Sequence, residues 1–426
     1  MTKNRIQGQE MEVENPQRRR FLKAGAAVGA TFGASLALGN PLLPTKLAFA
    51  ALPSDRKTIF IQLKGGLDQM ALFPPVGDPA YAAARKSLAL PNFGAPRAPI
   101  KLTNLFGLHP MAEALLPFWT RKELAVAAAT GNQFADGSHF SAQEILENGY
   151  GRIGGDGSGW MGRMLRASDA TPETSFFVGE AMPLLLQEPG GTSRATLVPA
   201  PTLSKGHESR LSVIHNHDLL LGPALSNAKR SHLKAQRKLP ADDQNADGNA
   251  SSILGLEKAA KMAARIISGP GEQNIAVLEA GGFDIHQDQG TSTGPLARKL
   301  AALSGAIEAI AFEMANDWDN TTIVVSTEFG RSVAPNNDGG TDNGHAGLTM
   351  LIGGAVRGGK FIGGWPGLEK NQLGARGGVK PTVDIRSIYK AILEEHLKIS
   401  PSIIENEIFP NSADARALIG LIDTLS

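Results

Sequence analysis

Short runs of apolar and β-branched residues recur along the chain, and glycine-rich or polar turns follow them. The runs cover 58–64, 124–128, 274–279, 321–327 and 348–353. Their length and composition are typical of buried strands. We therefore predict five strands.

Longer amphipathic stretches lie between and after these runs. They predict helices over 110–121, 141–147, 252–267, 295–316 and 383–397. Strands that alternate with helices favour an α/β fold, in which helices cover both faces of a mostly parallel sheet. Sheets of this kind carry their sites outside the carboxyl ends of the strands.

Residues 180–250 do not follow this alternation. They are rich in Pro, Gly, Ser and His, and they end in a polar segment at 239–249. We expect them to form an insertion or cap subdomain within a domain that covers residues 51–426.

The N-terminal segment has the pattern of an export signal. Arg18 and Arg19 precede an uncharged stretch over 24–45, which is typical of a twin-arginine signal, and 48–50 reads Ala-Phe-Ala. Small residues at this spacing mark a signal peptidase site. We expect residues 1–50 to be a signal peptide that the Tat translocase and signal peptidase process, which would make the mature protein periplasmic.

An uncut membrane anchor is the alternative interpretation of this segment. Four glycines and two prolines lie between positions 25 and 44. They are unfavourable in a helix that spans the hydrocarbon core, so the cleaved signal is the better explanation.

Composition narrows the classes of function. The chain has no cysteine, which excludes disulfides, thiolate metal sites and cysteine nucleophiles. Residues 1–50 hold seven of the 42 basic and three of the 41 acidic residues, so the rest of the chain has 35 basic and 38 acidic residues and a net charge of −3. This balance does not favour binding to nucleic acid or to an anionic membrane.

Acidic, imidazole and guanidinium groups cluster next to the predicted strands. They are Asp68 after the first strand, His139 after the second, Asp284 and His286 after the third, Glu328 and Arg331 after the fourth, and Asp342 and His345 before the fifth. Carboxylates and neutral imidazoles at one sheet edge suit a divalent metal such as zinc or manganese. Such an ion can polarise an ester oxygen or lower the pKa of a bound hydroxyl.

Simpler roles exist for single members of this set. Ser138, at a predicted helix start, has free N–H groups nearby that can hold an anionic ester, but it is also a favourable N-cap residue. Asp68 can cap a turn. Asp284 and His286 share a face only where the backbone is extended. Glu328 ends a buried strand and needs a partner there.

Six motifs resemble those of one protein family. They are Gly-Leu-His-Pro at 107–110, Ser-His-Phe at 138–140, Ser-Gly-Trp-Met-Gly-Arg at 158–163, Gly-Gly-Phe-Asp-Ile-His at 281–286, Glu-Phe-Gly-Arg at 328–331 and Gly-Thr-Asp-Asn-Gly-His at 340–345. In this order they resemble the bacterial exported family called domain of unknown function 1501, which is related to the sulfatases and the alkaline phosphatase superfamily. The resemblance implies an alkaline-phosphatase-like fold.

The resemblance also implies roles for particular residues. Relatives of this kind use a metal-binding Asp after the first strand, a Ser or Thr nucleophile at a helix start, and later Asp and His ligands. The matching positions in order are Asp68, Ser138, Asp284, His286 and His345. Phe329 stands where an imidazole ligand is expected, and the spacing from Asp284 to His286 is short. These departures do not match a two-metal mechanism, and the alternative is a single ion.

Our leading hypothesis is an exported, metal-dependent hydrolase that acts on a phosphate or sulfate ester. Its expected metal ligands are Asp68, Asp284, His286, Glu328 and His345. Ser138 is the candidate nucleophile, His139 a candidate acid, base or ligand, and Arg331 a candidate contact for the anionic group.

The rival hypothesis is a periplasmic binding or assembly protein that retains the fold without the chemistry and acts with another exported protein. The missing imidazole at Phe329 favours it.

Overall fold

A sheet of mostly parallel strands organises the chain in our computed structural model. The structure describes residues 52–131, 137–179, 181–198, 255–271 and 273–423. The predicted signal peptide and residues 199–250 of the predicted insertion lie outside the described residues.

The sheet has nine strands within the described ranges, and its order is β10-β4-β9-β8-β1-β7-β5-β6, with β11 beside β4. The strands are β1 Lys57–Leu63, β4 Leu124–Gly131, β5 Ser175–Val178, β6 Ala195–Val198, β7 Ile275–Ala280, β8 Thr321–Thr327, β9 Gly347–Ile352, β10 Lys360–Phe361 and β11 Val383–Asp384. All five predicted strands are present. The sequence pattern did not reveal β5 or β6, and β6 comes from the segment expected to form an insertion.

Strand β9 is the exception to the parallel arrangement, since it runs antiparallel to both β4 and β8. A parallel return needs a crossover connection, usually a helix. No helix is found over 328–346, between β8 and β9. An apolar run predicts a buried strand but not its direction. The antiparallel direction of β9 is therefore known only from the structure.

Strand β1 lies in the interior of the sheet and pairs in parallel with β7 and β8. All seven of its residues are buried. Ile59 and Ile61 face one hydrophobic core, whereas Phe60 faces the other. This explains the nearly continuous apolar sequence, because a strand covered on both faces has no polar side.

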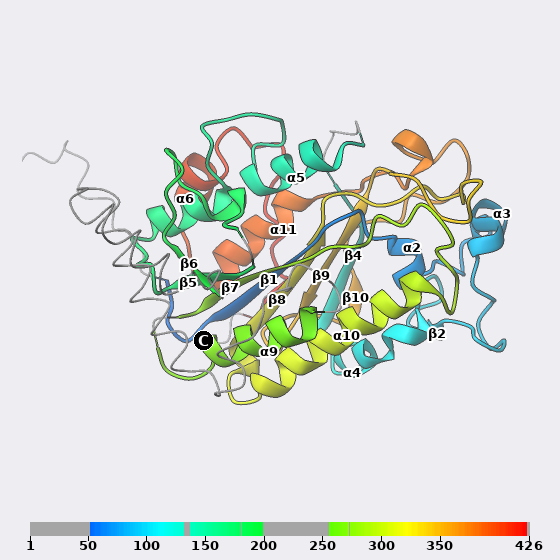
Figure 1. The fold of residues 1–426 in the computed structure, drawn as a ribbon, viewed down its shortest axis with the longest axis horizontal. Coiled ribbons are helices and arrows are strands. Elements are labelled where there is room, and N and C mark those ends of the chain that lie inside the picture. Colours follow the sequence, from blue (N-terminus) through cyan, green and yellow to red (C-terminus); the bar gives the residue numbers. More distant parts are fainter. Residues whose placement is uncertain (1–51, 132–136, 180, 199–254, 272, 424–426) are drawn as a thin grey trace, which may run out of the picture. The chain divides into compact units, whose positions relative to one another are not determined.

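Helices cover both faces of the sheet, as predicted (Figure 1). On one face lie α4 (Leu116–Thr120), α9 (Leu256–Ile267) and α10 (Pro295–Glu313), and on the other lie α5 (His139–Asn148), α6 (Trp160–Ala167) and α11 (Ile385–Ala391). The other helices of the described residues are α2 Gln69–Leu72, α3 Tyr81–Arg85 and α12 Pro401–Ile403, with π-helices over Ile392–His396 and Ile404–Ile408.

Shorter elements complete the described part of the fold. The 3₁₀ turns are Lys86–Leu88, Pro110–Leu115, Leu184–Leu186, Trp318–Asn320 and Ala375–Gly377, and β2 (Ile100–Lys101) pairs with β3 (Gly107–Leu108). The helix predicted over 110–121 is thus a 3₁₀ turn followed by α4. Ala112 has non-helical dihedral angles, which separate the two pieces.

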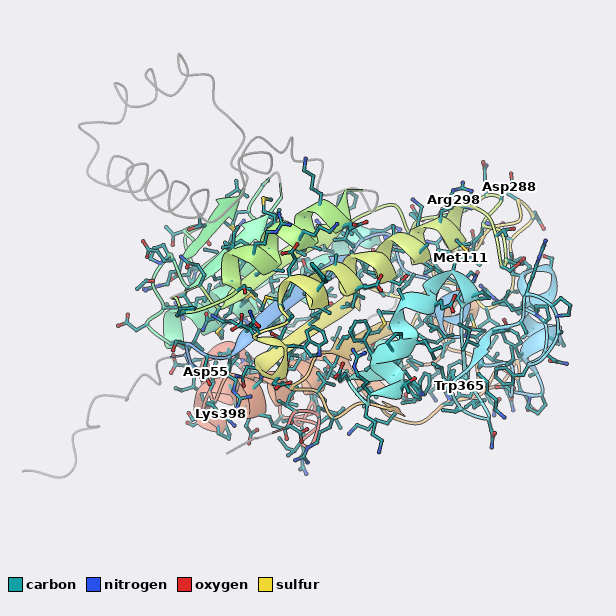
Figure 2. The ribbon with its side chains drawn as sticks, turned by 90° about the horizontal axis from the view of Figure 1, so that it is seen from below. Asp55, Met111, Asp288, Arg298, Trp365 and Lys398 are labelled. Atoms are coloured by element: carbon teal, nitrogen blue, oxygen red, sulfur yellow. The ribbon has the colours of Figure 1, made fainter. Side chains whose placement is uncertain are left out.

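The carboxyl ends of the parallel strands lie at one end of the domain. Figure 2 shows the face covered by α9 and α10, with Asp55, which precedes β1, at the opposite end from Asp288, which follows β7. Seven of the eight predicted site residues follow parallel strands, whose carboxyl ends lie at the Asp288 end, and His345 precedes the antiparallel β9. Within the described ranges, no helix has the length and apolar character needed to cross a membrane.

Candidate active site

The loops after β1 and β7 approach each other closely because Gly65 lies between them. Gly65 has φ +106°, and a Cβ atom at this position would lie 2.4 Å from the backbone nitrogen of Asp284. Only glycine combines this dihedral angle with this contact. The glycine pair that ends the first predicted strand therefore brings Asp284 to the end of β1.

Glu328 follows β8 and joins this loop to its neighbour. Its Oε1 accepts the N–H groups of Gly65 (2.7 Å) and Gly66 (3.1 Å), and its Oε2 accepts the hydroxyl of Thr327 (2.9 Å). The side chain is only 3% exposed. The buried carboxylate thus has the partners that its position requires.

His139, the first residue of α5, lies between two carboxylates. Its Nδ1 is 2.8 Å from Glu328 Oε1, and its Nε2 is 3.5 Å from Asp284 Oδ1. The Nε2 atom is buried and has no hydrogen-bond partner among the described residues. The hydrogen bond with Glu328 raises the pKa of His139, against the effect of burial, and the charges of Glu328 and Asp284 add to this rise.

Asp284 is the centre of the cluster. Its Oδ1 lies 2.7 Å from His286 Nε2 and accepts a hydrogen bond from Arg331 Nη1 at 2.8 Å. Burial raises the pKa of Asp284, but the hydrogen bond and charge of Arg331, together with both imidazoles, outweigh burial and hold that pKa below its usual value. Asp284 is therefore an ionised carboxylate at neutral pH.

His286 repeats the arrangement of His139. Its Nδ1 lies 3.1 Å from Asp342 Oδ1, which also accepts a hydrogen bond from Asn336 Nδ2 at 3.1 Å. The hydrogen bond from Asn336 lowers the pKa of Asp342 against the effect of burial, and His286 lowers it further. The side chains of Asp284 and His286 are 44% and 46% exposed, so this part of the cluster is open to solvent.

Arg331 is enclosed by protein oxygens. It is 1% exposed, and its Nη1 donates to Asp284, to Asn343 Oδ1 (2.6 Å) and to Gly65 O (3.3 Å). Its Nη2 and Nε donate to Thr341. This geometry favours a role in orienting Asp284, whereas the sequence predicted a direct contact with an anionic substrate.

Asp68, an expected metal ligand, has protein partners in this structure. It is 2% exposed, and its Oδ2 accepts hydrogen bonds from Arg85 Nη2 and from Gln289 Nε2 (2.6 Å). Its Oδ1 has no hydrogen-bond partner among the described residues. Asp68 is thus neutralised by a buried guanidinium. Nothing in the sequence pattern marked Arg85 as its partner.

Ser138 and His345 complete the predicted set. Ser138 is the N-cap residue of α5, and its Oγ accepts the N–H of Ser141 at 3.4 Å. It directly precedes His139 and therefore lies beside the cluster. His345 Nδ1 accepts the N–H of Ala375 at 3.4 Å.

The structure thus brings five of the eight predicted site residues into contact in one cluster. They are His139, Asp284, His286, Glu328 and Arg331. It adds Thr341 and Asp342, which belong to the motif at 340–345, and Gln289 and Arg85, which lie in no motif named above.

The donor set fits a single divalent ion chemically. Within the described ranges, no three His, Asp or Glu side chains are already spaced to coordinate an ion. Carboxylates only accept hydrogen bonds. A cation between an imidazole nitrogen and a carboxylate oxygen would therefore satisfy both atoms. An imidazole that binds a metal through one ring nitrogen often donates its other N–H to a carboxylate.

Comparison with models of known protein families gives a match, which covers most of the motifs named above. The family described as "Protein of unknown function (DUF1501)" matches residues 125–406, and the chain belongs to this family. This confirms the resemblance inferred from the ordered motifs. A search of the curated proteins found no match.

Several solved structures are similar to this chain at low identity. The phosphonate monoester hydrolase of Agrobacterium radiobacter has 11% identity and a TM-score of 0.36, over 85% of this chain and 76% of that one. An alkaline phosphatase superfamily protein from Vibrio parahaemolyticus has 9% identity and a TM-score of 0.33, over 82% and 70%. The zinc complex of the C-terminal periplasmic domain of EcEptC from Escherichia coli has 8% identity and a TM-score of 0.30, over 72% and 77%. Similarities at this level assign no activity to this chain.

Proposed function

We propose that this protein is a metal-dependent hydrolase of phosphate or sulfate esters, with His139, Asp284 and His286 as the ligands of one divalent ion. One observation carries the proposal: two imidazoles, each with Nδ1 against a carboxylate, direct Nε2 toward the same oxygen of Asp284. A cation among these three atoms would satisfy all of them.

Each residue of the cluster has a distinct role in this proposal. Glu328 and Asp342 accept the Nδ1 protons, which leaves Nε2 of His139 and of His286 free to bind the ion. Arg331 holds Asp284 in place. When bound, a divalent ion would polarise the ester oxygen or lower the pKa of a water nucleophile.

Ser138 remains the candidate nucleophile because it directly precedes His139 at the start of α5. The first N–H groups of this ten-residue helix and its dipole favour an anionic ester at that position. The ligand set differs from the sequence expectation, since Glu328 orients a ligand in place of binding the ion, and Asp68 is paired with Arg85.

Metal content tests the proposal directly. Mass spectrometry of the mature chain, purified without chelators, should find one equivalent of zinc or manganese, which His286→Ala removes and Glu313→Gln retains. Glu313 pairs with Arg265 on α9 and is a carboxylate outside the cluster. Phosphate and sulfate esters should then be hydrolysed only by the loaded protein. A folded wild-type protein without metal would overturn the proposal.

The second candidate function is that of a binding or assembly protein that has lost catalysis, and one observation favours it. Arg331 forms an ion pair with Asp284 at 2.8 Å, so a protein side chain already balances the charge of this carboxylate. A protein that binds an exported partner through this fold would carry no metal and hydrolyse none of these esters.

We also propose export by the twin-arginine route to the periplasm. The pattern at Arg18 and Arg19 supports it. Replacing both with lysine should leave the uncleaved precursor in the cytoplasm, whereas the wild-type N-terminus should begin at Ala51.

A further inference from the structure

We propose that Asp68 and Gln289 are positioning residues that hold Arg331, and through it Asp284, in one orientation. The link from this orientation to ion binding rests on the proposed function. The chain of contacts itself is visible in the structure.

The contacts form a relay of four buried side chains, which are Asp68, Gln289, Thr341 and Arg331. Gln289 Nε2 donates to Asp68 Oδ2 (2.6 Å), and Gln289 Oε1 accepts the hydroxyl proton of Thr341 (2.8 Å). Thr341 in turn accepts two hydrogen bonds from Arg331, at its carbonyl oxygen and, at 3.3 Å, at its Oγ1. The exposed fractions of the four residues are between 0% and 2%.

Arg85 fixes both ends of this relay. One of its nitrogens donates to Asp68, and its Nη1 donates to the carbonyl oxygens of Ser332 (3.3 Å) and Val333 (3.0 Å), which directly follow Arg331. Buried charges and amides are costly without partners, so each group is confined to the partners it has here. The relay therefore allows Arg331 few alternative orientations.

Asp284 depends on this rigidity because Arg331 is the buried partner of a side chain that is open to solvent. Its side chain is 44% exposed, whereas the arginine that holds it is 1% exposed. A metal ligand on a solvent-exposed loop keeps its orientation only if the residues that contact it are themselves held by packing and hydrogen bonds. The relay supplies this support from the loop after β1 to the loop after β8.

The first test removes only the central hydroxyl. Thr341→Val keeps the size of the side chain and the carbonyl contact but breaks the link between Gln289 and Arg331. We expect the affinity for Zn²⁺ to fall roughly 10- to 100-fold, the usual effect of an outer-shell change. Thr341→Ser should restore it.

Thr196→Val is the matched control. Thr196 lies in β6, is 8% exposed and donates from Oγ1 to the carbonyl oxygen of Pro172 at 2.8 Å. It therefore loses one buried hydrogen bond outside the relay and should keep the wild-type Zn²⁺ affinity. Wild-type affinity in Thr341→Val, or an equal loss in both variants, would overturn the inference.

A second measurement separates the relay from the proposed function. If the wild type binds no Zn²⁺, the hydrolase proposal fails, but the relay can still be tested in the ion-free protein. The side chains of Asp68 and Thr341 both form a hydrogen bond with Gln289. The effects of Asp68→Asn and Thr341→Val on the midpoint of thermal unfolding should be non-additive, whereas Asp68→Asn and Thr196→Val should add. Additivity of the first pair would contradict the relay.

Discussion

Glu328 Oε1 lies 2.8 Å from His139 Nδ1, although 189 residues separate them in sequence. The same oxygen accepts the N–H groups of Gly65 and Gly66. One buried carboxylate therefore connects the ends of β8 and β1 to the start of α5. This connection sets the position of the His139 imidazole, whose Nε2 lies 3.5 Å from Asp284 Oδ1.

Replacing Glu328 with glutamine should lower the pKa of His139. The amide oxygen can still accept hydrogen bonds, so the fold should persist, but the negative charge that favours the imidazolium is lost. NMR titration of the ion-free protein measures this pKa. Glu313→Gln should leave it unchanged, and an unaltered pKa in Glu328→Gln would contradict the assigned contact.

The sign of the matching pH effect on stability follows from the raised pKa of His139. The contact with Glu328 stabilises the fold fully below the ordinary imidazole pKa of 6.5, and this contribution disappears as the pH rises through the raised value. In Glu328→Gln, the unfolding free energy should depend less on pH in this window.

Asp342→Ala should weaken metal binding without affecting the fold. Asp342 holds Nδ1 of His286 from an exposed loop, and its loss frees the ring to rotate. We expect the Zn²⁺ affinity to fall roughly 10- to 100-fold by competition with a chelator. Asp338→Ala, an exposed acid of the same loop, is the control. Equal affinity in the two variants would remove Asp342 from the site.

Gly65→Ala should be far more damaging than Gly154→Ala. Both glycines have positive φ, +106° and +85°, but only at Gly65 does a Cβ meet backbone, 2.4 Å from Asp284 N; at Gly154 nothing lies within 4 Å. Urea denaturation should show a loss of about 1 kcal/mol for Gly154→Ala and at least about 3 kcal/mol for Gly65→Ala. Similar losses would show that the close approach is not required.

His396 should make the fold sensitive to acid. It is fully buried, with Nε2 3.1 Å from the carbonyl oxygen of Lys57, and burial lowers its pKa from 6.5 to about 4. Because the unfolded chain takes up this proton first, the unfolding free energy should fall as the pH drops from 6.5 toward 4, by on the order of 3 kcal/mol.

His396→Gln tests this assignment because its amide can still donate to Lys57. Denaturation curves at several pH values should show a flatter dependence between pH 4 and 6.5 than in the wild type. An unchanged slope would assign the acid sensitivity to other groups.

Much of the fold was predictable from short-range patterns. The apolar run at β1 and the amphipathic stretch at α10 depend on which face each element buries, and this is encoded locally. The direction of β9 and the two strands β5 and β6 were not predictable, because pairing partners come from distant parts of the chain.

The sequence by itself determined the family, the α/β class and the placement of Asp284, His286 and Glu328 next to strands. Only the tertiary structure decided which of these side chains meet. Asp68 faces Arg85, Glu328 faces His139, and Arg331 points inward at Asp284. Strand ends bring residues to a common edge, but side-chain direction and burial choose the partners, and both depend on contacts that form only when distant segments pack together.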